Sequence, residues 1–76
     1  MKLTAEQRRA LGILAGARHG TTEALMLANG LKPKLLAGLV LAGLATVETE
    51  TVRPGGPTMK VERYCITDDG WQALLE

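Results

Sequence analysis

Apolar residues recur every three to four positions in the first quarter of the chain. Between Thr4 and His19, alanine, leucine and isoleucine form one stripe, and polar residues lie away from it. This period predicts an amphipathic helix over residues 4–18. A shorter apolar stretch over residues 22–29 predicts a second helix, because the turn-forming pair Asn29-Gly30 closes it.

Residues 35–42 read Leu-Leu-Ala-Gly-Leu-Val-Leu-Ala, without one polar side chain. Pro33 suits the first turn of a helix, because the N–H that proline lacks would have no intrahelical partner there. Gly43 suits the end of a helix, since glycine readily adopts the left-handed conformation that closes one. We therefore predict a third helix over residues 32–42.

After Gly43 the pattern changes from a helical period to alternation. β-Branched residues alternate with other residues over 45–52, and residues 58–66 return as a partner strand. Residues 53–57, Arg-Pro-Gly-Gly-Pro, cannot form regular structure, so we predict that they are the tip of a hairpin. Thr67 is then the expected cap of a last short helix over residues 68–75.

Three short motifs accompany this order of elements. Residues 21–25 read Thr-Thr-Glu-Ala-Leu at the start of the second helix, and residues 66–70 read Ile-Thr-Asp-Asp-Gly after the hairpin. The exit from the third helix into the first strand has the residues Leu36, Leu39, Gly43, Leu44 and Val47. This combination resembles the winged helix domains of bacterial transcription regulators, the multiple-antibiotic-resistance-regulator kind among them. The resemblance implies an α+β fold, a winged helix-turn-helix with a three-helix core, a two-stranded β wing and a short C-terminal helix, in a single domain over residues 1–76.

The resemblance also implies binding to double-stranded DNA, but the third helix has little with which to read a base sequence. Recognition of base edges needs hydrogen-bond donors and acceptors in the major groove, and residues 35–42 provide none. We therefore expect weak binding, mainly to phosphates, as in a small transcriptional regulator or accessory protein. The expected contacts come from the start of the third helix and from the wing: Lys32, Lys34, Arg53, Lys60 and Arg63.

Charge is distributed unevenly along the chain, although the net charge is only +1. Residues 1–34 contain six Lys or Arg and two Glu, for a net charge of +4. Residues 35–76 contain three Lys or Arg and six Asp or Glu, for a net charge of −3. The first half thus offers a modest basic surface. Within it, Arg8, Arg9 and Arg18 are expected to be ordinary surface residues of the first helix.

The apolar third helix supports an alternative function. A helix that is apolar on all sides needs cover on all sides, and Leu35, Val40 and Leu41 cannot all face the core. Either the helix over 68–75 folds back over them or they contact another chain, in a protein-interaction module that binds no DNA. A leucine-rich domain of 76 residues buries a small core, so we also expect a homodimer.

Catalysis and cofactor binding find little support in the composition. The chain has no serine, one histidine and one cysteine, so we expect no catalytic residue, no metal site and no cofactor. The first residues lack the apolar core of a signal peptide, and no apolar run reaches the roughly 20 residues that span a bilayer. Cys65 without a partner suits a reducing compartment. We expect a cytoplasmic protein without membrane contact.

Overall fold

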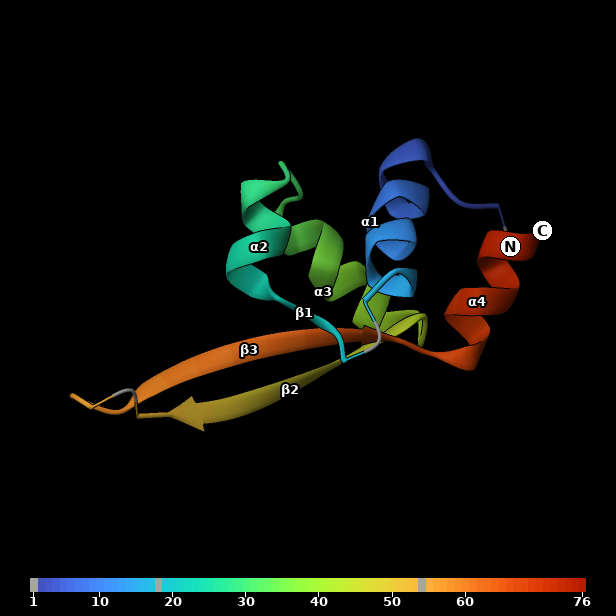
Figure 1. The fold of residues 1–76 in the computed structure, drawn as a ribbon. Coiled ribbons are helices and arrows are strands. Elements are labelled where there is room, and N and C mark those ends of the chain that lie inside the picture. Colours follow the sequence, from blue (N-terminus) through green and yellow to red (C-terminus); the bar gives the residue numbers. More distant parts are fainter. Residues whose placement is uncertain (1, 18, 54) are drawn as a thin grey trace.

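Four helices and three strands follow one another along the described part of the chain (Figure 1). The structure is a computed structural model, and it describes residues 2–17, 19–53 and 55–76. Arg18 and Pro54, which the sequence assigns to the first helix and to the hairpin tip, lie outside this part. The elements are α1 (Ala5–Ala15), β1 (Thr21–Thr22), α2 (Glu23–Ala28), α3 (Pro33–Leu41), β2 (Ala45–Val52), β3 (Met59–Ile66) and α4 (Asp68–Leu75). The fold is a mixed α+β fold, as the sequence predicts.

The sheet has three antiparallel strands in the order β1-β3-β2, one more than the two strands expected from the sequence. β2 and β3 form a hairpin and pair along their whole length. The additional strand is β1, in which Thr21 pairs with Tyr64 and Thr22 pairs with Arg63. Two residues are too few to show an alternating pattern, and their partner lies far along the chain. The expectation of a two-stranded sheet is therefore corrected.

Helix α1 is shorter than the range 4–18 that its apolar period predicts. It begins after Thr4, which forms a capping box with Gln7: each side chain accepts the other residue's backbone N–H, at 3.1 and 2.9 Å. It ends at Ala15, and Gly16 is the capping residue. The N–H of Gly16 donates to the carbonyls of Gly12 and Leu14, which closes the last turn before the apolar period ends.

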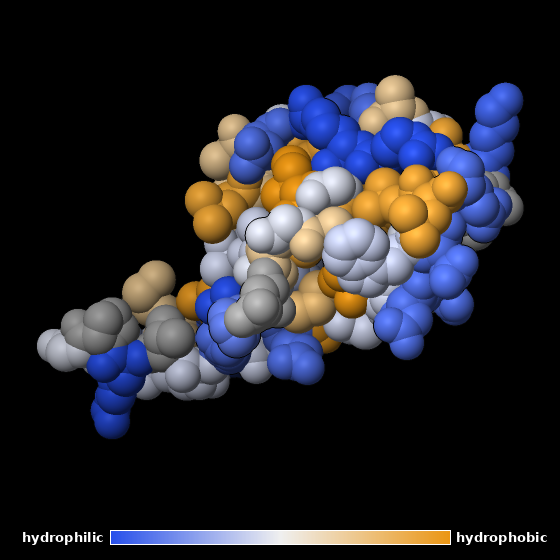
Figure 2. All heavy atoms as spheres, turned by 45° about the vertical axis from the view of Figure 1, so that its right-hand side comes forward, coloured by the Kyte–Doolittle hydropathy of each residue, from blue (hydrophilic) through white to orange (hydrophobic). Residues whose placement is uncertain are grey.

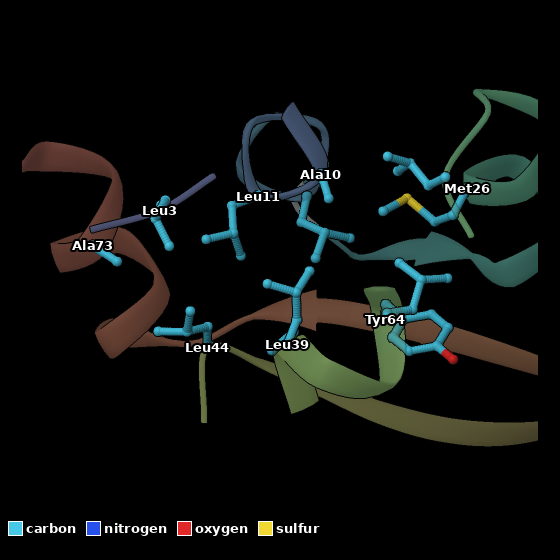
Figure 3. Packing of buried hydrophobic residues seen from close by; sticks show 12 residues of the cluster. Leu3, Ala10, Leu11, Met26, Leu39, Leu44, Tyr64 and Ala73 are labelled. Atoms are coloured by element: carbon cyan, nitrogen blue, oxygen red, sulfur yellow. The ribbon is translucent and has the colours of Figure 1, made fainter. Parts of the chain in front are cut away.

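The hydrophobic core lies between the helices and one face of the sheet. Figure 3 shows Leu11 of α1 and Leu39 of α3 near its centre, with Leu3 and Ala73 at the α4 side and Met26 and Tyr64 at the α2 side. Leucine provides most of the buried volume, as the composition requires. The largest fully buried side chains are Leu11, Leu14, Met26, Leu36 and Leu39.

Helix α4 packs backbone against backbone on the connection between α3 and β2. Thr67, which precedes α4, donates its backbone N–H to the carbonyl of Leu44 at 3.1 Å and its hydroxyl to the carbonyl of Gly43 at 2.7 Å. Gly70 faces the same connection, and a Cβ there would lie 2.7 Å from Cγ1 of Ile66 and closer still to the carbonyl oxygen of Leu44. Only glycine permits this approach.

The β2–β3 hairpin extends well beyond the helices (Figure 1). It makes the molecule elongated, with extents of 44 × 22 × 21 Å. The hairpin projects on the side where α2 lies, whereas α4 lies at the other end of the molecule (Figure 1). Among the described residues, no helix combines the length and the apolar character that crossing a bilayer requires.

Candidate nucleic-acid interface

Helices α2 and α3 are joined by a short turn over residues 29–32. Asn29 caps α2, and its backbone N–H donates to the carbonyl of Leu25 at 3.1 Å. Gly30 has a φ of 84°, a left-handed conformation that lets the chain reverse direction within the turn. Leu31 is buried in the core and anchors the turn. The start of α3 is thereby held beside α2.

Two of the expected DNA contacts lie at this start of α3. Lys32 is the N-cap residue and Lys34 belongs to the first turn, and both are exposed. No side chain caps the amino terminus of α3, so the partial positive charge of the helix dipole adds to the two lysines. The first turn of α3 contains no acidic residue. This end of the helix therefore has the charge that attracts a phosphate.

The outward face of α3 is apolar, and two of its three residues are small. Leu36 and Leu39 face the core, while Ala37 and Gly38 are exposed and Leu41 has 89% of its surface exposed. None of the three outward residues can donate or accept a hydrogen bond at a base edge. The other two expected interface residues, Leu35 and Val40, are half-buried and pack against the protein's own core. Of the expected interface set, Leu41 is thus the exposed member.

The hairpin is basic at its far end and acidic along its stem. Arg53 lies at the end of β2 and Lys60 at the beginning of β3, and both are exposed. Arg63 lies nearer the helices and is half-buried, and its guanidinium is 3.4 Å from the carboxylate of Glu50 in an ion pair. Arg63 therefore has an acidic partner within the hairpin, whereas Arg53 and Lys60 form no ion pair with another described residue. The expected contacts therefore form two groups, one on α3 and one at the hairpin's far end, with Arg63 in neither.

A groove of about 620 Å³ lies between α2 and the hairpin stem. Glu23 of α2 and Glu62 of β3 line it, and the hydroxyl of Tyr64 donates to the carboxylate of Glu23 at 3.2 Å. Hydrogen bonding and charge from Glu23 raise the pKa of Glu62 above its usual range. Burial, together with Glu23 and Glu62, raises the pKa of Tyr64. Lys60, one of the expected contacts, also lines this groove, so acidic and basic side chains meet in it.

The cluster of Glu23, Glu62 and Tyr64 was not found from the sequence. Strand alternation places Glu62 and Tyr64 on the same face of β3, and this part of the cluster is visible in the sequence. Their contact with Glu23 depends on how α2 packs against the sheet, and no local pattern indicates that packing.

Other site chemistry is sparse in the part of the chain that the structure describes. His19 is exposed, and Cys65 is a half-buried free thiol in β3. Within residues 2–17, 19–53 and 55–76, no group of three or more His, Cys, Asp or Glu side chains is placed to hold a metal ion. No protein-family model, curated protein or solved structure matches the chain. The candidate interface accordingly rests on the geometry of its own residues.

Proposed function

We propose that this chain is a winged helix domain that binds double-stranded DNA mainly through phosphates, as a small transcriptional regulator or accessory protein. Its architecture supports the proposal, because a helix, turn and helix lead directly into a projecting hairpin. The start of α3 lies beside α2, on the side of the molecule from which the hairpin extends (Figure 1). A duplex on that side would meet the helix and the wing together.

The observation that carries the proposal is the placement of four exposed cations, Lys32, Lys34, Arg53 and Lys60. None of them forms an ion pair with another described residue, so all four are available to phosphates. Because the outward face of α3 lacks base-reading groups, these cations provide affinity with little sequence preference. Each phosphate neutralised releases counterions from the duplex, so affinity falls steeply with salt.

The test is fluorescence anisotropy with two labelled duplexes of unrelated sequence, measured between about 50 and 200 mM salt. Four phosphate contacts predict a slope of log affinity against log salt concentration of about −3 to −4. The two duplexes should bind with similar affinity. Absence of salt-dependent binding to either duplex at the lowest salt concentration would refute the proposal.

Matched lysine variants locate the contact. Lys34→Ala should weaken binding to both duplexes equally and reduce the salt slope by about one. Lys2→Ala removes the same charge from an exposed position outside α3 and the wing, and it should leave the slope unchanged. Equal effects of the two variants would show that net charge, rather than the start of α3, determines binding.

A second candidate function is binding of another protein through α3, without DNA. The exposure of Leu41 beside Ala37 and Gly38 favours it, because this face allows a close approach of another chain. Leu41→Glu distinguishes the two functions. If α3 binds a protein, the variant loses that partner, and the wild-type protein shows no salt-dependent DNA binding. If the wing and the start of α3 bind phosphates, the variant keeps most of its DNA affinity.

A further inference from the structure

Helix α4 has an apolar face that the described part of the chain covers only in part. Gly70 and Ala73 face the core, whereas Trp71 and Leu75 have 45% and 76% of their surfaces exposed. These two residues are four positions apart, so they lie one above the other on the outer side of the helix. Figure 2 looks toward the α4 side of the molecule and shows hydrophobic surface there, bordered by strongly hydrophilic surface. The chain's only tryptophan belongs to this face.

Charged side chains lie at both ends of α4. Asp68 and Asp69 are exposed in the first turn. At the other end lies Arg8 of α1, which donates from Nη1 to the carbonyl of Leu74 at 3.1 Å and remains exposed. Lys2 adds a positive charge at this end, because the neighbouring Leu3 lies beside Ala73 (Figure 3), and Glu76 adds a negative one. The apolar face is therefore flanked by an acidic end and by an end where Arg8 is exposed.

We infer that this face binds a second copy of the chain, with the two α4 helices antiparallel about a two-fold axis. A surface with Asp68 at one end, apolar side chains in the middle and Arg8 at the other end is complementary to itself when reversed. With the axis level with Ala73, Trp71 lies opposite Leu75 of the second copy. Asp68 then lies beyond the C-terminal end of the opposite α4, near Arg8 of the second copy. By symmetry, the pair of Asp68 with Arg8 forms twice in the dimer.

The exposed α3 face is a weaker basis for self-association. Leu35 and Val40 already pack against the core. The remaining Leu41 is not flanked on α3 by two residues of opposite charge. The α4 surface has two large apolar side chains, with Asp68 at one end of the helix and Arg8 of α1 at the other. An eight-residue helix is about 12 Å long, so the contact is small and the dimer dissociates in the micromolar range or above. This inference does not depend on DNA binding.

Sedimentation velocity without DNA tests the inference, over a concentration series from about 5 to 500 μM. The wild-type protein should change from monomer to dimer, and the emission of Trp71 should shift to shorter wavelength in parallel as the indole leaves water. Leu75→Glu should remain monomeric at every concentration. Leu25→Glu is the matched control, because Leu25 is 56% exposed on α2, and it should dimerise like the wild type. Far-UV circular dichroism should show that both variants are folded.

Charge reversal tests the antiparallel arrangement. Asp68→Lys and Arg8→Glu should each weaken dimerisation, and the double variant should recover most of it, because the pair then forms with reversed signs. Failure of the double variant to recover would overturn the arrangement. A wild-type protein that stays monomeric throughout would overturn the inference, as would loss of the dimer in Leu41→Glu but not in Leu75→Glu. None of these outcomes alters the DNA measurements.

Discussion

Replacing Gly70 by alanine should destabilise the protein, although alanine is the better helix former. Gly70 lies in the first turn of α4, directly against the carbonyl of Leu44 and the side chain of Ile66. A Cβ at this position would lie 2.7 Å from Ile66 Cγ1, far inside the usual contact distance, and nearer still to a backbone oxygen that cannot rotate away. The first turn of α4 would have to move outward.

The magnitude follows from what that movement breaks. Separation of α4 from the α3–β2 connection weakens both hydrogen bonds of Thr67, to Leu44 and Gly43, at about 1 kcal/mol each. The displaced packing adds about 1–3 kcal/mol, as in other overpacked cores. The higher helix propensity of alanine offsets about 1 kcal/mol. We therefore expect a loss of about 2–4 kcal/mol, a large part of the stability of so small a domain.

Urea unfolding provides the measurement, followed by circular dichroism at a few micromolar protein so that self-association does not contribute. A small domain loses about 1 kcal/mol of stability per molar urea, so the midpoint should fall by about 2 M or more. Gly38→Ala is the matched control, because Gly38 also lies within a helix and a Cβ there would meet nothing within 4 Å. That variant should gain up to about 1 kcal/mol.

The two glycine variants must therefore change stability in opposite directions. If Gly70→Ala is as stable as the wild type, or gains stability as Gly38→Ala does, α4 does not pack against the α3–β2 connection as described. The same result would remove the basis for a fixed α4 surface.

Two further predictions concern local hydrogen bonds and protonation. Thr67→Ala removes the cap of α4 and should lower the free energy of unfolding in urea by about 1–2 kcal/mol. Thr58→Ala, at an exposed position before β3, should lower it little. Equal losses in the two variants would contradict the capping role. Glu23 raises the pKa of Glu62, so the folded protein holds the proton of Glu62 more tightly than the unfolded chain does. Stability should therefore fall as the pH rises above about 4.5 through the folded-state pKa. Glu62→Gln should reduce this pH dependence. The raised pKa of Tyr64 has the same sign, so stability should fall as the pH rises above 10, and Tyr64→Phe should remove that fall; an unchanged pH profile in either variant would contradict the proposed contact.

Much of the fold could be predicted because its signals are local. The helical period, the capping residues Thr4 and Thr67, and the change to alternation after Gly43 are each visible within a few residues. They predict the α+β class, the four helices and the hairpin. The two-residue strand β1 could not be predicted, because its existence depends on pairing with Tyr64 and Arg63 across a long separation in sequence.

The candidate site was less predictable, for the same physical reason. Exposure of Lys32 and Lys34 follows from their place at a helix start, and exposure of Arg53 follows from its place in a turn. The ion pair of Arg63 with Glu50 depends on the register between β2 and β3, which composition does not reveal. The apolar pattern of α3 also did not indicate that Leu35 would be covered from within the chain.

Strand β3 contacts the beginning of α2 through two neighbouring residues. Thr22 pairs with β3 through its backbone and caps α2 through its side chain, at 3.3 Å from the N–H of Leu25. The next residue, Glu23, accepts the hydroxyl of Tyr64. A force applied at the distant hairpin end therefore reaches the helix pair through short, stiff links. The hairpin and the two helices should therefore reorient as one rigid unit, so that a displacement of either also displaces the other.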